Sequence, residues 1–269
     1  MKKQWLIILA AAALVLTGCP PKEQGTTGTG GGSNGGEILV GEYGSLTGSE
    51  GTFGVSTHNG IMMAVDEING NGGVGGRKIK VITEDDQSKA EEAANAVTKL
   101  ISQNGVVAVL GEVASSNSLA AAPICQSNKV PMITPSSTNP SVTQKGDYIF
   151  RMCFIDTYQG PVMARYLVND LKLTRAAILT DVRSDYSRGL GDAFKATYTS
   201  LGGKIVGEAS YAKGDSDFRG GLTAIKATSP QVIYVPGYYN DVGQIAQQAR
   251  DLGITVPLAG GDGWESPKL

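Results

Sequence analysis

Two loops rich in hydroxyl side chains are the first places where this sequence could bind something. Each follows a short apolar run typical of a buried parallel strand, Val106–Leu110 and Val130–Ile133. The first loop is Glu112–Ser118 and the second is Thr134–Pro140. In an open α/β sheet, ligands bind at the carboxyl ends of strands, where hydroxyls and the N–H groups of a helix start can hold an anion. The two loops therefore predict a cradle for a small anion such as a carboxylate.

The same loops also have a purely structural explanation. Ser, Thr and Asn at a helix start are ordinary N-caps, and the sequence Pro-Ser-Ser-Thr-Asn-Pro is ordinary loop chemistry. Spacing alone favours this explanation, so the binding hypothesis depends on the rest of the chain.

The elements that must position these loops alternate between strand and helix. The first series consists of strands Ile38–Tyr43, Lys78–Thr83, Val106–Leu110, Val130–Ile133 and Tyr148–Phe154, with helices Gly54–Asn69 and Ser88–Gln103 and an Ala-rich helix after Ser118. The alternation then restarts with helices Gly160–Leu171, Asp185–Leu201, Phe218–Ala227 and Asp241–Leu252 and strands Ala176–Thr180, Lys204–Ser210, Gln231–Val235 and Val256–Ala259. We expect an α/β fold with two Rossmann-like lobes, residues 37–155 and 156–269, each with a mostly parallel sheet, and a ligand cleft between them.

In the second half, polar and aromatic residues again follow the strands. They are Asp181, Arg183, Asp185 and Tyr186 after the first strand, Tyr238, Tyr239 and Asn240 after the third, and Asp262 to Trp264 after the fourth. A tyrosine is an apolar plate with a hydroxyl, and a carboxylate can hold an ammonium group. Each tyrosine alone could be a half-buried surface residue, but their concentration at strand ends favours a site.

Composition limits the possible partners. The chain has 269 residues, 41% hydrophobic and 18% charged, with a formal net charge of −2. This is a globular composition, and it does not favour binding to nucleic acid or to an anionic membrane surface.

The N-terminus has the pattern of an export signal. Lys2 and Lys3 precede an apolar run, Trp5–Leu16, that is too short for a membrane span, so residues 1–18 are predicted to be a signal peptide. The following Leu16-Thr17-Gly18-Cys19 resembles the lipobox of bacterial lipoproteins, which implies a lipid on Cys19. A plain secretory leader is the alternative. Residues 19–36 are predicted to be a Gly/Thr/Ser-rich flexible tether.

The usual catalytic arrangements are absent from the sequence. The single histidine, His58, is predicted on the first helix with a solvated side chain, and there is no Gly-x-Ser-x-Gly elbow. Glu84–Asp86 is the only acidic cluster, and a solvated loop or helix cap explains it better than a cation site. Cys125 and Cys153 could be bonded or free, and the sequence leaves both open. We expect no enzyme activity, no cofactor and no metal.

From Glu37 onward the chain resembles the substrate-binding proteins of branched-chain amino acid ABC transporters, the leucine/isoleucine/valine-binding family of periplasmic binding proteins type I. The segments that carry the resemblance are Gly44–Gly48, Ala64–Asn69, Gly72–Gly76, Asp85-Asp86, Ala114–Ser116, Thr134–Pro140, Asp156 with Gln159-Gly160, Gly237–Tyr239 and Gly261–Gly263. Metabotropic glutamate receptors share this framework, including Asp262-Gly263-Trp264.

The resemblance implies a role for each matching position. Ser115 and Thr138 would bind the α-carboxylate of an amino acid. The α-ammonium would meet Asp262, the carbonyl of Ser136 and the hydroxyl of Tyr238. Tyr186 would close over the ligand, Phe53 would pack on its side chain, and Asp156 would help to hold the amine.

Two features depart from the family pattern. The cysteine pair that the family has in its first domain is replaced here by Gln87-Ser88 and Ala114. The sequence also stops at Leu269, where family members continue by roughly a third of their length, so we expect the second lobe to be incomplete.

These inferences combine into one hypothesis. The chain is expected to be a lipid-anchored, extracytoplasmic receptor that captures an apolar amino acid by hinge closure and delivers it to an ABC permease. The alternatives are a binding protein for an aromatic acid, an amide or urea, and an extracellular sensory domain.

Overall fold

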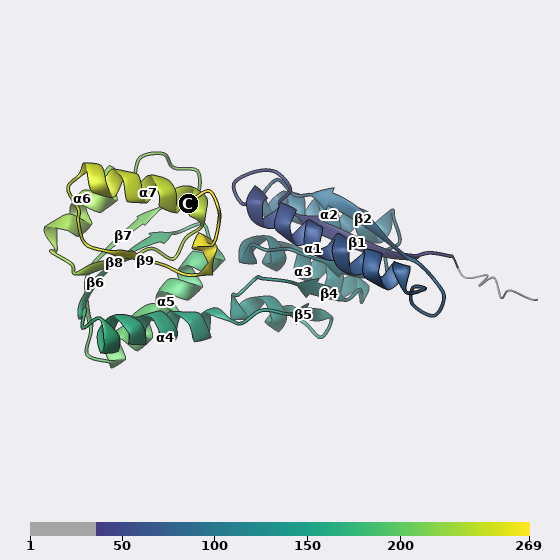
Figure 1. Cartoon of the computed structure of the whole chain (residues 1–269), viewed down its shortest axis with the longest axis horizontal. Helices are drawn as coiled ribbons and strands as arrows, with labels where there is room; N and C mark the ends of the chain where they lie inside the picture. Colours follow the sequence, from purple (N-terminus) through teal and green to yellow (C-terminus); the bar gives the residue numbers. More distant parts are fainter. Residues whose placement is uncertain (1–35) are drawn as a thin grey trace, which may run out of the picture. The chain divides into compact units, whose positions relative to one another are not determined.

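The computed structural model describes residues 36–269, and two parallel β-sheets organise them (Figure 1). Within these residues the first sheet has five strands: β1 (Ile38–Gly44), β2 (Ile79–Asp85), β3 (Ala108–Leu110), β4 (Met132–Thr134) and β5 (Ile149–Arg151). The second has four strands: β6 (Arg175–Asp181), β7 (Lys204–Tyr211), β8 (Val232–Tyr234) and β9 (Leu258–Ala259). The strand pairs in both sheets are parallel, which confirms the predicted α/β class.

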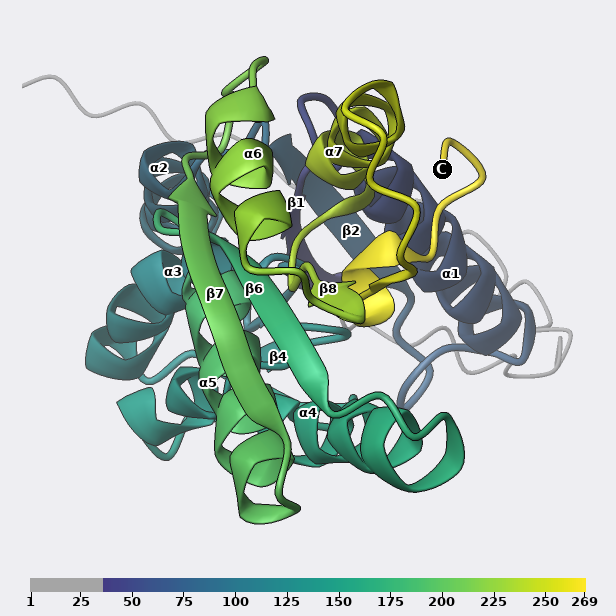
Figure 2. The same ribbon diagram turned by 90° about the vertical axis from the view of Figure 1, so that its left-hand side faces the viewer.

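The strand orders place the strands that carry the predicted loops next to each other. The first sheet has the order β2-β1-β3-β4-β5, and the second has the order β7-β6-β8-β9. In the first sheet β3 pairs with β4, so the two hydroxyl-rich loops leave the same sheet edge from neighbouring strands, as predicted. Figure 2 shows the second sheet with β7, β6 and β8 side by side.

Helices cover the sheets and define two lobes. We call the first sheet with α1 (Gly51–Gly70), α2 (Ala90–Ser102) and α3 (Ser115–Asn128) the first lobe. The second lobe is the second sheet with α4 (Asp156–Arg165), α5 (Asp185–Ser200), α6 (Arg219–Ala227) and α7 (Tyr239–Asp251). In the second lobe, α6 and α7 lie on one face of the sheet and α4 and α5 on the other (Figure 1).

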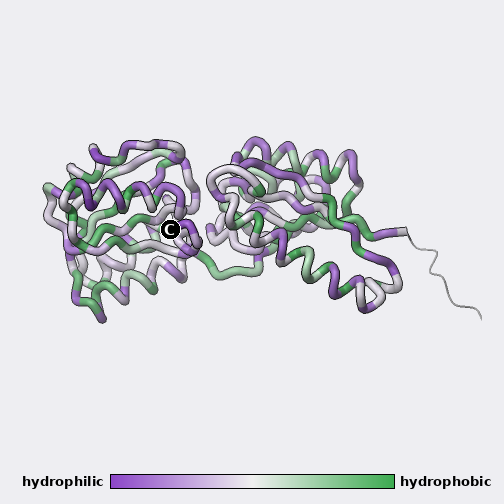
Figure 3. Tube along the Cα trace, turned by 45° about the horizontal axis from the view of Figure 1, so that its top comes forward, coloured by the Kyte–Doolittle hydropathy of each residue, from purple (hydrophilic) through white to green (hydrophobic). Residues whose placement is uncertain are grey.

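Burial of apolar side chains holds each lobe together. In the first lobe, residues of α2 and α3 pack with β1, β3 and β4 in one core that includes Leu100, Val109 and Met132, all fully buried. In the second lobe, each face of the sheet has its own core. Figure 3 shows hydrophobic stretches along the strands and hydrophilic positions along the helices. Each fully buried Leu or Met side chain contributes roughly 1.5–3 kcal/mol of transfer free energy.

Several predicted helices begin at a different residue: α1 begins at Gly51 rather than Gly54, which places Phe53 on the helix, and the largest difference is at α4. The pattern predicted a helix from Gly160 to Leu171, but α4 already begins at Asp156 and ends at Arg165, followed by a π-helical turn from Tyr166 to Asp170. The reason is that Pro161 lies in the helix rather than near its start, so an interior proline was read as part of a helix boundary. Asp156 is therefore in the first turn of a helix and not in a connecting loop.

Candidate functional site

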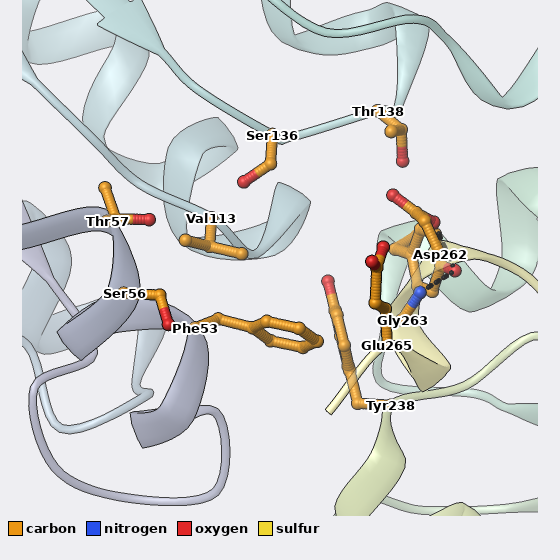
Figure 4. Close-up of a pocket in the computed structure, with 11 residues that line it drawn as sticks. Phe53, Ser56, Thr57, Val113, Ser136, Thr138, Tyr238, Asp262, Gly263 and Glu265 are labelled. Atoms are coloured by element: carbon orange, nitrogen blue, oxygen red, sulfur yellow. Dashed lines mark hydrogen bonds between the residues drawn. The ribbon is translucent and has the colours of Figure 1, made fainter. Parts of the chain in front are cut away.

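A cavity of about 210 Å³ lies where loops of the two lobes meet. The first lobe contributes residues of α1 and of the loops after β3 and β4, and the second contributes residues after β8 and β9 and the start of α5. The lining residues are Phe53, Ser56, Thr57, Val113, Ser136, Thr138, Tyr186, Tyr238, Asp262, Gly263 and Glu265 (Figure 4). We call this the first cavity.

Most of the predicted ligand-binding residues line this cavity together. They are Phe53, Ser136, Thr138, Tyr186, Tyr238 and Asp262. Residues that lie up to about two hundred positions apart in the chain are thus brought to one place, because all of them sit at carboxyl ends of strands or on helix starts.

Ser115 does not line the first cavity. It is the first residue of α3, 1% exposed, and its hydroxyl accepts a hydrogen bond from the backbone N–H of Asn139 at 3.2 Å. Ser115 therefore ties the start of α3 to the loop that carries Thr138. This contact positions the loop of Thr138 from outside the cavity lining.

Asp156 also lies behind the cavity. It is fully buried, and its Oδ1 accepts a hydrogen bond from Nε2 of Gln159 at 3.1 Å. Burial raises the pKa of the Asp156 carboxyl to about 6, and the hydroxyl of Thr138 and the amide of Gln159 partly oppose that rise. Gln159 connects Asp156 to the cavity wall, because the same Nε2 donates to Asp262 Oδ1 at 2.9 Å.

Asp262 is the most firmly positioned charged group of the cavity. Its Oδ1 accepts a hydrogen bond from the hydroxyl of Tyr186 at 2.7 Å and one from Gln159 Nε2, while its backbone N–H donates to Gln159 Oε1 at 3.2 Å. Both side-chain bonds end on Oδ1, and no hydrogen bond within residues 36–269 ends on Oδ2. Figure 4 shows the carboxylate directed toward Thr138 across the cavity.

The turn that carries Asp262 packs closely on Tyr186. The backbone N–H of Gly263 donates to the Tyr186 hydroxyl at 3.0 Å. A Cβ atom at Gly263 would lie 2.6 Å from the carbonyl oxygen of Gly237, so only glycine fits this approach. Tyr186 is 2% exposed, and burial raises the pKa of its hydroxyl well above the usual value, with the nearby Asp262 carboxylate as the next cause. The hydroxyl therefore stays protonated and remains a donor to Asp262.

On the opposite side, a buried polar network holds the hydroxyl-rich loops. Glu112 is fully buried. Its Oε1 accepts one hydrogen bond from the backbone N–H of Ser45 at 3.0 Å and another from the Ser45 hydroxyl at 2.7 Å. Its Oε2 accepts a bond from the N–H of Ala114, and its carbonyl accepts bonds from Thr134 and Ser137. Burial raises the pKa of the Glu112 carboxyl, and the charge of nearby Asp86 raises it further. These bonds fix the backbone that leads to Ser136 and Thr138.

Sequence reasoning missed several cavity residues. Ser56 and Thr57 lie three and four residues after Phe53, on the same face of α1, so helical spacing could have indicated them. Val113 and Glu265 carried no separate signal. Gln159 was noted only as part of the resemblance, although it bridges Asp156 and Asp262.

The structure differs in part from two predictions about polar residues outside the cavity. The His58 side chain is 34% exposed, so it is partly solvated as predicted, but its Nδ1 also lies 2.8 Å from Oε2 of the buried Glu42. The Glu84–Asp86 cluster was expected in a solvated loop or cap, but Asp86 is fully buried and accepts a bond from the hydroxyl of Ser45 at 3.0 Å. Ser45 of the loop after β1 pairs with Asp86, and Glu42 of β1 itself pairs with His58, and no local pattern indicates either partner.

Other sequence predictions concern features outside the cavity. Residues 1–18, Cys19 and the predicted tether up to Gly35 lie outside the described residues. Cys125 is buried, Cys153 is half-buried, and both are free thiols. Within residues 36–269 no helix is long and apolar enough to span a membrane. The same residues contain no group of three or more His, Cys, Asp or Glu placed to hold a metal ion.

Several direct contacts join the two lobes around the cavity. Asp185 of α5 makes three of these contacts. The Ser116 hydroxyl donates to Asp185 Oδ2 and accepts a bond from the Asp185 N–H, both at 2.9 Å. Asn139 Nδ2 donates to the Asp185 carbonyl at 2.8 Å. On another side, Lys213 Nζ lies 2.8 Å from Oε2 of the buried Glu50. The two lobes are therefore joined by hydrogen bonds and an ion pair that lie outside the lining of the first cavity.

An α/β chain of two parallel-sheet lobes with a polar cavity between them has the architecture of a two-lobed solute-binding protein. The sequence matches the family described as periplasmic binding protein over residues 37–268. The chain therefore belongs to the periplasmic binding protein family.

Known relatives agree with this assignment. An amino acid binding protein of Pseudomonas aeruginosa is 34% identical over 234 residues, which cover 87% of this chain and 62% of the relative. The crystal structure of the leucine binding protein LivK from Thermotoga maritima is similar with a TM-score of 0.82 and 39% identity, covering 86% of this chain and 65% of that one.

A further solved structure, LivJ from Streptococcus pneumoniae in complex with isoleucine, is similar with a TM-score of 0.80 and 37% identity, covering 86% of this chain and 66% of that one. The chain thus spans a little less than two thirds of the length of the relatives it matches.

Proposed function

We propose that this chain binds an amino acid in the first cavity and contributes no chemical step. The observation that carries the proposal is the arrangement of Asp262. One of its oxygens is fixed by Tyr186 and Gln159, and the other is directed across the cavity toward Thr138. A preorganised carboxylate facing hydroxyl groups suits a zwitterion, whose ammonium pairs with the acid and whose carboxylate accepts bonds from hydroxyls.

In this proposal each lobe binds one end of the ligand backbone. The carboxylate lies against the hydroxyls of Ser136 and Thr138 in the first lobe, whose loop Ser115 positions. The ammonium lies against Asp262 and the Tyr238 hydroxyl in the second lobe. Because the two ends are held by different lobes, binding favours their closure about a hinge near the boundary of residues 37–155 and 156–269.

The side chain of the ligand would lie against Phe53 and Val113. Both are apolar and line the cavity. The names of the relatives support an apolar amino acid of the branched-chain type. An aromatic acid without an ammonium group has less support, since Asp262 and Glu265 both contribute carboxylates and no Lys, Arg or His is among the described lining residues.

The experiment that tests this proposal removes one end of the ligand at a time. By titration calorimetry, L-leucine should bind, whereas 4-methylpentanoate, which lacks the ammonium, and 3-methylbutylamine, which lacks the carboxylate, should each bind at least about a hundredfold more weakly. An amide and an aromatic acid belong in the same series. Equal affinity for L-leucine and 4-methylpentanoate would contradict the zwitterion site.

We also infer that the protein works outside the cytoplasm, anchored by a lipid on Cys19 and paired with an ABC permease. The support is the family, whose name is periplasmic, and the leader and lipobox-like sequence up to Cys19. Cys19→Ala in the producing cell should move the protein from the membrane fraction to the soluble exported fraction. If the variant stays in the membrane fraction, Cys19 is not the anchor.

A further inference from the structure

A second cavity, of about 150 Å³, lies beside the first. Tyr238 lines both cavities and so separates them. The first lobe contributes Ser116 and Asn117 at the start of α3, and the second contributes Arg183, Ser184 and Lys213. The residues that line it include two cations and no Asp or Glu, which is the reverse of the first cavity.

Asn117 is the observation that points to a ligand. It lines the second cavity, is 2% exposed, and its Nδ2 makes no hydrogen bond within the described residues. A buried amide donor is nearly always paired, because leaving it unpaired costs about 1–3 kcal/mol. A half-turn of the Asn117 amide about χ2 exchanges Nδ2 with Oδ1 and presents the donor to the cavity, so the unpaired donor can meet an acceptor there.

The positive charges are available to such an acceptor to different degrees. The guanidinium of Arg183 is exposed and takes part in no hydrogen bond or ion pair of residues 36–269. Lys213 Nζ is shared, at 2.8 Å from Glu50 Oε2 and 2.8 Å from the carbonyl of Ser88. Arg183 is thus free, whereas Lys213 is paired with Glu50 and also lies near the carboxyls of Asp181 and Asp241.

The backbone adds to the positive electrostatic potential of the second cavity. Helix α3 has 14 residues and begins at Ser115, so its first turn directs N–H groups and the positive end of its dipole toward the region of Ser116 and Asn117. The Ser184 hydroxyl accepts a bond from the Ser187 N–H at 3.1 Å, which leaves its own proton free to donate. The Ser116 hydroxyl is already committed to Asp185.

We propose that the second cavity binds a small inorganic anion, such as sulfate, phosphate or chloride, between Asn117 of the first lobe and Arg183 of the second. This site is distinct from the amino acid site of the first cavity. An anion held by both lobes stabilises their closed arrangement. By linkage, the anion and a ligand that requires the same closed arrangement strengthen each other's binding.

Direct titration tests the site without reference to an amino acid. Sodium sulfate, phosphate and chloride are each titrated into the whole protein in a gluconate buffer of constant ionic strength. At least one of them should bind saturably at one site. Arg183→Glu should weaken that binding at least about tenfold, since it replaces a charge-assisted donor with a repelling carboxylate.

The matched control is Arg165→Glu. Arg165 is an exposed arginine of α4 that does not line either cavity, and it has the same change of charge. This variant should bind the anion as the parent does. The proposal is overturned if none of the three anions binds saturably, if Arg183→Glu binds as well as the parent, or if both variants lose binding equally.

Asn117→Ala separates anion binding from folding. Because Asn117 Nδ2 has no partner among the described residues, its removal loses no hydrogen bond of the anion-free protein. The variant should keep or raise the melting temperature measured without anion, and should lose most of the rise in melting temperature that the anion gives the parent. An unchanged rise in melting temperature would exclude Asn117 from the site and overturn the proposal.

Discussion

The two sides of the first cavity are built in different ways. On the first-lobe side, the cavity residues Ser136 and Thr138 are neutral, and the buried Glu112 and its partners fix the backbone that carries them. On the second-lobe side, the carboxylates of Asp262 and Glu265 line the cavity, and that of Asp262 is itself held by Tyr186 and Gln159.

This difference between the two sides of the cavity indicates which single groups ligand binding depends on and which single groups folding depends on. On the first-lobe side, the essential carboxyl group, that of Glu112, lies outside the cavity lining and supports structure, so changes at the cavity surface should have small effects. On the second-lobe side, the essential charge lies at the surface of the cavity, so one change there should remove binding without unfolding the lobe. The following four predictions test this contrast.

Asp262→Asn should have the largest effect on binding. Asparagine keeps an oxygen for Tyr186 and Gln159, so the geometry survives, but the ammonium group of the ligand loses its charged partner. L-leucine should therefore bind about a hundredfold more weakly by calorimetry, a loss of about 2.7 kcal/mol of binding free energy. Glu265→Gln is the matched control, since Glu265 lines the same cavity but is exposed, and it should change the affinity less than threefold, roughly, as expected for an exposed charge. Equal losses in both variants would show that the total charge matters and not the position of Asp262.

Glu112→Ala should have the largest effect on stability. It leaves the N–H groups of Ser45 and Ala114 without their buried acceptor, so the free energy of unfolding should fall by about 3 kcal/mol in a urea titration. Glu84→Ala is the control, because Glu84 makes only a partly exposed ion pair with Lys99 and should cost less than about 1 kcal/mol. A small effect of Glu112→Ala would mean that the loops of the first lobe do not need this network.

Asp156→Asn should change how stability depends on pH. The folded-state pKa of about 6 lies above the unfolded value, so the folded protein holds the proton more tightly. Between about pH 4 and pH 6 Asp156 should cost the parent about 2 kcal/mol of stability, and the variant should lose that much less, because only the other buried carboxyls with raised pKa values still titrate. Urea titrations of both proteins at pH 4 and pH 7 check this, with equal stability expected at pH 4 and a more stable variant at pH 7. Parallel pH profiles would contradict the raised pKa.

Thr138→Val should have the smallest effect. It removes one hydroxyl while keeping the shape, so L-leucine should bind about fivefold more weakly, or about 1 kcal/mol, and the melting temperature should fall slightly because the buried Asp156 carboxyl loses its Thr138 contact. Ser136→Ala is the companion variant, expected to behave similarly because its hydroxyl lines the same wall. A loss as large as that of Asp262→Asn would mean that the first-lobe side also depends on a single group.

Much of the fold could be predicted because it repeats a simple pattern. Short runs of Val and Ile followed by polar loops are buried parallel strands, and the structure confirms that β3 and β4 are neighbours. Element ends were less predictable. The early start of α4 depends on an interior proline that the helix tolerates, which local pattern rules treat as a boundary.

Site residues were predictable where a residue type at a strand end has few other uses. Asp262, Tyr238 and Thr138 belong to this group, and they line the cavity together. Ser115 shows the limit, since its type and place suit ligand binding, yet it does not line the cavity, and its hydroxyl accepts a bond from the Asn139 N–H while its own proton stays free to donate. Glu112 and Gln159 were not predicted as supports because their partners are far away in sequence, and only packing brings them close.

Asp185 has a consequence for the timing of exchange. Its backbone and side chain make three bonds to Ser116 and Asn139 across the lobes, none of which involves a residue that lines the first cavity. If the lobes must part before a captured molecule escapes, these bonds set its residence time without adding to the contacts that recognise it. The rate at which the proposed ligand dissociates could therefore evolve separately from the ligand specificity.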